Sequence, residues 1–301
     1  MVDLALLGCG GGMPIPERYL SSCLLSYNGR KVLIDCGEGT QVSMKILGWG
    51  FKSIDVICIT HGHGDHILGL PGLLLTIGNS GRTKPITLIG PRGITDIVKG
   101  LRVVAPYLPY ELNIIENPKR PVEINDLIIS TLELDHSTDC LGYSFYFRRK
   151  AKFDVESAII NEIPKIFWSR LQRNETIIEN GKTYLPGMVM GKERMGIKLS
   201  FITDTRPIPE IETFIKKSDL FICEGTYGDE NQIEKAIKNK HMTFIEAAKL
   251  ALNGEVEELL LTHFTPAMLN PQDYKEGAAD IFKNTTIGSD RLVKTLSFNE
   301  V

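Results

Sequence analysis

Short runs of β-branched and other apolar residues alternate with Gly, Pro and Asn along most of the chain, a pattern typical of strands joined by turns. These runs predict ten strands, at residues 4–7, 23–27, 31–35, 56–60, 86–89, 128–134, 141–147, 198–203, 219–223 and 258–261. Apolar residues recur at helical spacing in six further segments, at residues 39–47, 67–77, 93–104, 229–239, 243–252 and 272–282. Because strands and helices alternate in both halves, we predict an α/β (α+β) fold with two sheets packed face to face and helices outside.

The composition is that of an ordinary globular protein. The chain has 301 residues, 43% of them hydrophobic and 24% charged, which is long enough to bury a full core. Six cysteines are spaced at least 13 residues apart, so we expect reduced thiols of a cytoplasmic protein rather than disulfides. The first residues lack the basic and long apolar regions of a signal peptide. The longest apolar run, residues 67–77, is too short for the roughly 20 residues that cross a bilayer, so no membrane segment is expected.

The net charge of −3 conceals an uneven distribution. Between Arg148 and Lys198 there are 11 basic and 6 acidic residues, which gives this segment +5 and leaves −8 for the remainder. The segment interrupts the strand-rich chain in the way that an inserted arm would. Clustered basic charge is the usual footprint of phosphate binding, and a solvated surface insertion with chance charge is the alternative.

The strongest chemical signal is a dense group of metal ligands directly after the predicted strand at 56–60. His61, His63, Asp65 and His66 place four potential ligands within six residues, separated only by glycines and one another. The glycines let the backbone turn these side chains toward one point. Imidazole and carboxylate together favour zinc or another borderline divalent metal.

Three isolated residues could complete a larger metal site. His136, Asp204 and His263 each follow a predicted strand, in a chain that has only six histidines. A helix cap would explain Asp204 as well as a metal would. Their shared position at strand ends favours the metal interpretation.

Several short sequence motifs around these residues resemble those of one family. They are GCGGGMP at 8–14, LIDCGEGTQ at 33–41, GDHILGLPGLL at 64–74, DTRP at 204–207 and HMT at 241–243. With the metal motif they resemble ribonuclease Z, the tRNA 3′-processing endonuclease of the metallo-β-lactamase fold superfamily, from about residue 4 to 282. The resemblance implies a four-layer αββα sandwich, with residues 1–301 as a single domain and 148–198 as an inserted flexible exosite arm.

The resemblance also implies two Zn²⁺ ions per subunit, with Mn²⁺ or another divalent metal as the alternative. It assigns one metal to His61, His63 and His136, the second to Asp65, His66 and His263, and a bridging position to Asp204.

Catalytic roles follow from the same resemblance. Asp65 would be the general base, and His241 would protonate the leaving 3′ oxygen with Glu224 as its orienting carboxylate. Asp35 would hold a ligand imidazole, although a turn residue after the strand is an equally good interpretation.

Substrate contacts are expected in two places where the chain departs from the family pattern. The family's PxKxRN loop here reads PIPERY at 14–19, which keeps Arg18 as a phosphate contact. The arm has KIFWSRL at 165–171 where many bacterial members have a Gly-Pro turn. Lys165, Arg170 and Arg173 remain expected phosphate contacts, whereas Trp168 is expected in a local core.

We therefore predict a zinc-dependent endoribonuclease that removes the 3′ trailer of precursor tRNA and leaves a 3′-hydroxyl on the tRNA. Its expected partners are precursor tRNA and a second copy of the chain in a homodimer, with no DNA and no membrane, in the cytoplasm. One alternative is a phosphodiesterase or arylsulfatase of the same fold acting on small molecules, which would need no basic arm. Another is a non-catalytic RNA-binding scaffold, which would need neither the ligand set nor His241.

Overall fold

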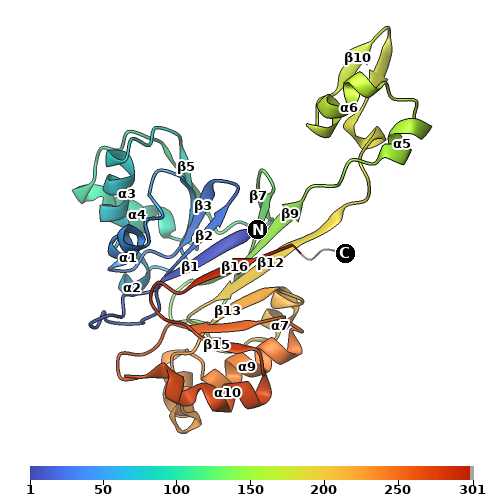
Figure 1. The fold of residues 1–301 in the computed structure, drawn as a ribbon. Coiled ribbons are helices and arrows are strands. Elements are labelled where there is room, and N and C mark those ends of the chain that lie inside the picture. Colours follow the sequence, from blue (N-terminus) through green and yellow to red (C-terminus); the bar gives the residue numbers. More distant parts are fainter. Residues whose placement is uncertain (299–301) are drawn as a thin grey trace. The chain divides into compact units, whose positions relative to one another are not determined.

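The computed structural model describes residues 1–298 and divides them into two compact units. The first contains Met1–Tyr146 and Ile197–Ser297, and the second contains Phe147–Gly196 and Phe298 (Figure 1).

The first unit contains two seven-stranded sheets. In spatial order, the strands of the first sheet are β16 (Val293–Leu296), β1 (Val2–Gly8), β2 (Ser22–Tyr27), β3 (Arg30–Ile34), β4 (Ile54–Cys58), β5 (Ile86–Gly90) and β6 (Leu112–Glu116). Those of the second sheet are β15 (Thr285–Ile287), β14 (Leu259–Thr262), β13 (Leu220–Glu224), β12 (Arg194–Ile202), β9 (Leu141–Arg149), β8 (Leu127–Glu133) and β7 (Val122–Ile124). Strands β3 to β6 run parallel, as do β12 to β15.

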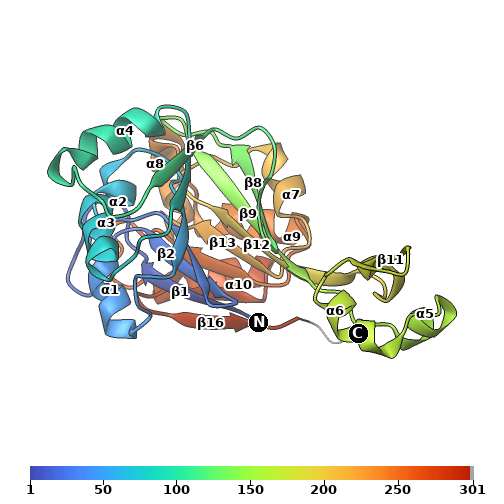
Figure 2. The same ribbon diagram turned by 90° about the horizontal axis from the view of Figure 1, so that it is seen from above.

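Helices cover the outer face of each sheet (Figures 1 and 2). The first sheet packs against α1 (Thr40–Leu47), α3 (Leu70–Asn79) and α4 (Ile94–Leu101). The second packs against α7 (Pro209–Ile215), α9 (Phe244–Asn253) and α10 (Lys275–Ile281). This arrangement confirms the predicted αββα sandwich. Within residues 1–298, every helix lacks the length and apolar character that a bilayer span requires.

The remaining helical elements of this unit are short. They are α2 (Gly64–Ile67), α8 (Ile233–Asn239) and the 3₁₀ turns η1 (Arg102–Val104), η3 (Glu230–Gln232) and η4 (Pro271–Tyr274).

A buried tyrosine joins the two sheets. The hydroxyl of Tyr143, on β9, donates to the carbonyl oxygens of Ile59 and Ile89 at 2.7 and 3.2 Å. Both acceptors lie next to or within the parallel strands β4 and β5 of the opposite sheet. The carboxyl ends of the parallel strands in both sheets are thereby held at one edge of the sandwich, where functional residues of such folds gather.

The second unit has regular structure and a small core of its own. It contains α5 (Val155–Ile160), α6 (Lys165–Gln172), the hairpin strands β10 (Ile177–Glu179) and β11 (Lys182–Tyr184), and the 3₁₀ turn η2 (Pro186–Met188). Ala158, Phe167 and Leu171 are buried in its apolar cluster, against which Trp168 packs. The indole Nε1 of Trp168 donates to the carbonyl of Ile163 at 2.9 Å, so the ring belongs to this local core. The sequence did not predict these helices and strands, and the single-domain organisation with an inserted arm stays a prediction.

All ten predicted strands and the six predicted helical segments have counterparts. Three segments, 93–104, 229–239 and 272–282, each contain a 3₁₀ turn next to an α-helix, and a fourth is divided between two α-helices. Residues 67–77 form the end of α2 and most of α3, separated at Gly69. A Cβ at Gly69 would lie 2.4 Å from the carbonyl oxygen of Gly37. The lack of a side chain at Gly69 therefore lets the chain pass close to the loop after β3.

Candidate metal centre and catalytic site

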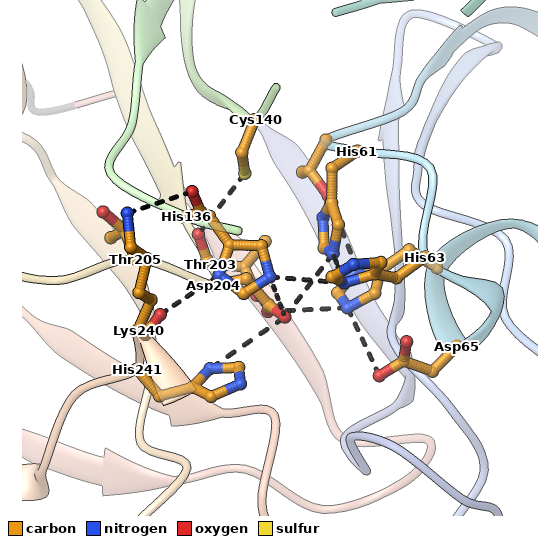
Figure 3. Close-up of polar contacts among 12 residues, drawn as sticks. His61, His63, Asp65, His136, Cys140, Thr203, Asp204, Thr205, Lys240 and His241 are labelled. Atoms are coloured by element: carbon orange, nitrogen blue, oxygen red, sulfur yellow. Dashed lines mark hydrogen bonds and ion pairs between the residues drawn. The ribbon is translucent and has the colours of Figure 1, made fainter. Parts of the chain in front are cut away.

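Two groups of metal-ligating side chains meet at the carboxyl edge of the sheets. Ligand atoms of His61, His63, His136 and Asp204 all lie within 4.8 Å of one another, as do those of a second group, Asp65, His66 and His263. The loop after β4 carries His61 and His63, and α2 carries Asp65 and His66. The other three ligands, His136, Asp204 and His263, follow β8, β12 and β14. All seven predicted ligands are therefore brought together. Figure 3 labels five of them, His61, His63, Asp65, His136 and Asp204.

Three of the side chains that build this edge stand on strained backbone. Asp35, Asp204 and His263 have φ values of 55°, 39° and 61°, in the left-handed region that non-glycine residues rarely adopt. Each lies just after a buried strand. Strain of this kind persists where surrounding structure enforces it, commonly at functional sites.

The proton of His66 is fixed by the residues behind its ring. Its Nδ1 lies 2.7 Å from a carboxylate oxygen of Asp35, and a carboxylate can only accept, so Nδ1 carries the proton. The same carboxylate accepts hydrogen bonds from the backbone N–H and the hydroxyl of Thr60. Burial opposes protonation of His66, but the Asp204 and Asp35 carboxylates raise its pKa well above the usual value. Because Asp35 holds the Nδ1–H, Nε2 is the nitrogen that can bind a metal once its proton is released.

His263 is oriented by a similar chain of contacts. The Thr226 hydroxyl donates to Glu224 at 2.5 Å, and its oxygen lies 3.1 Å from Nδ1 of His263. Because the hydroxyl proton is used by Glu224, the threonine oxygen accepts from Nδ1–H of His263, and Nε2 is the nitrogen turned to the site.

The Nε2 atoms of His66 and His263 face each other at 3.1 Å, within hydrogen-bond distance. A single proton on one of them makes this hydrogen bond, and a metal ion that displaces the proton can be bound by both nitrogens. His136 is oriented in the same sense, since its Nδ1 lies 3.1 Å from the carbonyl oxygen of Lys240 and its Nε2 is turned to the site. The donor set therefore fits divalent metal ions.

Asp204 lies between the two groups, with one carboxylate oxygen turned to each. Its Oδ1 is 3.4 Å from Nε2 of His66 and 3.2 Å from Nε2 of His263. Its Oδ2 is 3.6 Å from Nε2 of His61 and 3.7 Å from that of His136 (Figure 3). Burial alone would raise the pKa of Asp204, but the surrounding imidazoles lower it well below its usual value. An ionised carboxylate in this position suits a bridging ligand.

Asp65 is held by the loop after β1. The backbone N–H of Gly12 donates to its Oδ2 at 2.6 Å, and this oxygen is also 3.4 Å from Nε2 of His263. Burial would raise the pKa of Asp65, but its contacts with His263 and His66 lower it below the usual range.

His241 lies at the edge of the ligand groups, at the start of the segment that leads into α9. Its Nδ1 is 3.2 Å from a carboxylate oxygen of buried Glu224 and 3.9 Å from Oδ2 of Asp204. Burial opposes protonation, but the Glu224 carboxylate overcomes it and raises the pKa of His241 to about 9. His241 is therefore protonated at neutral pH and can act as an acid. Arg206 donates to the backbone carbonyl of His241 and forms an ion pair with Glu246, which fixes the main chain here.

Most of the ligand side chains, together with His241, line an open pocket of about 510 Å³. Its lining includes His63, Asp65, His241 and His263, and also Lys238 and Lys240 from the end of α8. The pocket is large enough for a nucleotide and combines acidic ligands with a basic rim.

The predicted substrate contacts have intramolecular partners. The guanidinium of Arg18 donates to the backbone carbonyls of Met268 and Leu269 at 2.8 and 2.9 Å, so it ties two loops together. In the second unit, Arg170 and Arg173 both pair with Glu175, and the Lys165 ammonium lies 5.9 Å from the centre of the Trp168 ring. Their contact with phosphate stays a prediction.

The sequence interpretation missed residues that orient the ligands. Thr60 and Thr226 both hold histidine rings, and Gly12 holds Asp65. The two threonines follow buried strands, as the predicted ligands do, and that shared position was the available signal. Gly12 and Lys240 act through backbone atoms, so their residue types do not indicate that they orient a ligand.

Comparisons with known proteins agree with this geometry. Ribonuclease Z from Clostridium beijerinckii is 62% identical over 307 residues, covering 100% of both chains, and that from Clostridium tetani is 56% identical, covering 99% of both. The short form of human tRNase Z, at 23% identity, superimposes with a TM-score of 0.69 over 99% of this chain and 100% of that one. The metallo-β-lactamase fold protein YhfI from Bacillus subtilis, at 18% identity, has a TM-score of 0.71 over 98% of this chain and 100% of that one. These two structures support the fold.

A family model described as the anti-Pycsar protein Apyc1 matches residues 2–167. That match includes the first ligand cluster and His136 but ends before Asp204, His241 and His263, whereas the curated relatives match the full length. Residues 2–167 thus belong to the family that the Apyc1 model describes, and the chain as a whole belongs to the ribonuclease Z family.

Proposed function

We propose that this protein is a zinc-dependent endoribonuclease that cleaves precursor tRNA at its 3′ side and leaves a 3′-hydroxyl on the tRNA. The observation that carries the proposal is the joining, at one edge of the two sheets, of seven metal-ligating side chains with the ion pair of His241 and Glu224. The relatives named ribonuclease Z support it over the full length of the chain.

The chain's own groups have distinct roles in this reaction. Bound divalent metal ions would supply positive charge for the phosphate and lower the pKa of a water. Asp65, held by the Gly12 N–H, accepts the proton of the attacking water. His241, kept protonated by Glu224, donates a proton to the departing 3′ oxygen. Asp35 fixes His66 in the tautomer that binds metal.

We extend the proposal to the details that the family implies. The metals are two Zn²⁺ ions per subunit, held by His61, His63 and His136 and by Asp65, His66 and His263, with Asp204 shared. The basic arm binds tRNA, and the protein acts as a homodimer in the cytoplasm. The six cysteines, all buried and free, suit a reducing compartment.

A comparison of two substrates tests the function. The zinc-loaded protein should cleave a precursor tRNA at its 3′ side, and a small aryl phosphodiester should be a poor substrate. Rapid turnover of the aryl phosphodiester with none of the precursor would instead support the small-molecule phosphodiesterase alternative.

Two substitutions test the catalytic roles. Asp65→Asn should abolish cleavage even where metal is retained. His241→Ala should slow precursor cleavage by about 10²–10⁴-fold, the range for loss of a general acid, without changing metal content. Full activity of the His241→Ala protein would remove this residue from the mechanism.

A further inference from the structure

Lys240, at the end of α8, has a backbone conformation that lysine rarely adopts. Its φ and ψ are 57° and 52°, in the left-handed region where Gly or Asn usually ends a helix. Lys240 comes directly before His241, and its carbonyl oxygen lies 3.1 Å from Nδ1 of the metal ligand His136 (Figure 3). A contact made by the lysine side chain would explain why glycine does not stand at this position.

The Lys240 ammonium makes such a contact with the residue before His136. Its Nζ donates to Oδ1 of Asp135 at 2.6 Å and lies 3.4 Å from the carbonyl oxygen of His136. Among the side chains of residues 1–298, that of Lys240 is the one that pairs with the Asp135 carboxylate. Both side chains are nearly half exposed, at 42% and 45%, and such pairs contribute little to stability. The effect of this pair should therefore be on position rather than on stability.

Asp135 is in turn fixed to the segment after β12. Its backbone N–H donates to the hydroxyl oxygen of Thr205 at 3.0 Å, and the backbone N–H of Thr205 donates to the Glu224 carboxylate at 2.7 Å. The other oxygen of that carboxylate lies 3.2 Å from Nδ1 of His241. The contacts therefore close a ring that runs from His241 through Glu224, Thr205 and Asp135 to Lys240, and back along the chain.

This ring holds His241 from two directions. Glu224 contacts the imidazole itself, and the pair of Lys240 with Asp135 anchors the residue directly before it. Without the pair, the left-handed turn loses its side-chain anchor, and the imidazole can shift relative to the metal ligands. A shift of about 1 Å is enough to slow a reaction that depends on exact placement of the reacting groups.

We propose that Lys240 and Asp135 are positioning residues for the acid, and that their ion pair sets where the His241 imidazole lies relative to the metal ligands. The inference rests on the proposed function, in which His241 protonates the departing 3′ oxygen, and adds two residues to it. It gives Lys240 a role different from the phosphate contact that its place on the rim of the pocket suggests.

Two substrates with different leaving groups test this role. The 3′ oxygen released from a precursor tRNA needs a proton, whereas the nitrophenolate released from bis(p-nitrophenyl) phosphate leaves without one. With zinc at saturation, Lys240→Gly should lower the single-turnover rate of precursor cleavage by about 10–100-fold and leave tRNA affinity within about twofold of the wild type. The slow hydrolysis of the aryl diester and the zinc content should not change. Because glycine suits a φ of 57°, this variant removes the side chain without straining the backbone.

Asp135→Asn tests the other half of the pair and leaves residue 240 as it is. It should slow precursor cleavage by a similar factor. The double variant Lys240→Gly/Asp135→Asn should be no slower than either single variant, because all three remove the same contact. The control is Lys217→Gly, at an exposed lysine that also has a positive φ, 56°, and that precedes β13 at the amino end of the parallel strands. It should keep the wild-type rates with both substrates.

Additive losses in the double variant, or a wild-type rate in Asp135→Asn, would overturn the proposal. Weaker tRNA binding with an unchanged cleavage rate in Lys240→Gly would overturn it too, and would make Lys240 a phosphate contact. Equal losses with both substrates would mean that the pair supports the metal centre rather than the acid, which also contradicts the proposal. Failure of the wild-type protein to cleave any precursor, with turnover of the aryl diester, would overturn the proposed function itself.

Discussion

At the scale of single residues, the metal centre depends on acceptors that lie behind the ligands. The Asp35 carboxylate accepts from His66 and twice from Thr60, so three donors converge on one side chain. Removing its charge affects the tautomer of a ligand without removing any ligand atom. The effect of Asp35 should therefore be seen in metal affinity.

We expect Asp35→Asn to lower metal affinity by about 10–100-fold, the usual effect of losing a partner of a ligating histidine. The amide nitrogen cannot accept, so the His66 and Thr60 donors compete for one oxygen. Equilibrium dialysis with zinc measures this. Asp3→Asn is the control, because Asp3 accepts only from the Thr295 hydroxyl among the described side chains and lies outside the site. Wild-type affinity in Asp35→Asn would contradict the role.

The Glu224–His241 pair predicts a pH dependence. The pKa of His241 is raised from 6.5 to about 9, so the pair stabilises the folded protein below about pH 6.5 and loses this contribution as pH rises through about 9. Cleavage that needs protonated His241 should fall over the same alkaline range. Glu224→Gln removes the charge but leaves His241 buried, so the alkaline limb of kcat/KM should move to lower pH.

The control for this prediction is Glu212→Gln, at a surface position that accepts from Asn253. Its pH profile should match the wild type. An unchanged alkaline limb in Glu224→Gln would show that another group sets it.

The types of the ligand residues could be predicted from the sequence because four lie together and the others follow apolar strands. Their orienting partners could not, since Thr226 and the Lys240 carbonyl reach His263 and His136 only after the chain has folded. Arg18 shows a second limit, a residue whose type indicates one contact while its position in the fold gives it others. Its charge favoured a phosphate contact, but its guanidinium satisfies backbone carbonyls that the sequence does not reveal.

At the scale of elements, close packing between loops places the ligands. A Cβ on Gly11 would lie 2.4 Å from Cε1 and 2.7 Å from Nε2 of His263, far inside contact distance. Gly11→Ala should therefore displace His263, lower the metal-to-protein ratio and reduce cleavage. Elemental analysis of purified protein measures the ratio.

The comparison for this substitution is Gly100→Ala in α4, where an added Cβ meets nothing within 4 Å. Its metal content should equal the wild type, and its free energy of unfolding should rise by up to about 1 kcal/mol, the helix preference of Ala over Gly. A wild-type metal-to-protein ratio in Gly11→Ala would mean that the loop containing residue 11 can shift without displacing His263.

Central strands were predictable because both faces are buried and their apolar runs are continuous. The short peripheral strands were not: β7 and β15 have three residues each, and such segments become strands only by pairing with a neighbour. The helices and strands within the expected arm at 148–198 escaped prediction for a similar reason. Its helices α5 and α6 have six and eight residues, and they are stabilised by packing on one another's apolar residues in a core that forms only when the segment folds.

At the scale of the whole molecule, the charge is divided between an arm segment of +5 and a remainder of −8. We expect removal of residues 150–192, replaced by a short Gly-Ser linker, to weaken tRNA binding and to spare hydrolysis of a small phosphodiester. The arm has a core of its own, so its removal leaves the apolar clusters of the two sheets intact. Each lost phosphate contact should reduce the slope of log K against log salt by about 0.7–0.9.

A charge variant separates electrostatics from the arm's fold. In Lys165→Gln/Arg170→Gln/Arg173→Gln, the salt slope should fall by about 2, less than three full contacts, because Glu175 already pairs with both arginines. Binding measured across a salt series gives the slope. Lys45→Gln/Lys52→Gln is the control, since these lysines line a separate pocket of the first unit and should leave the slope unchanged. A wild-type slope in the arm variant would mean that these three side chains do not contact tRNA phosphates.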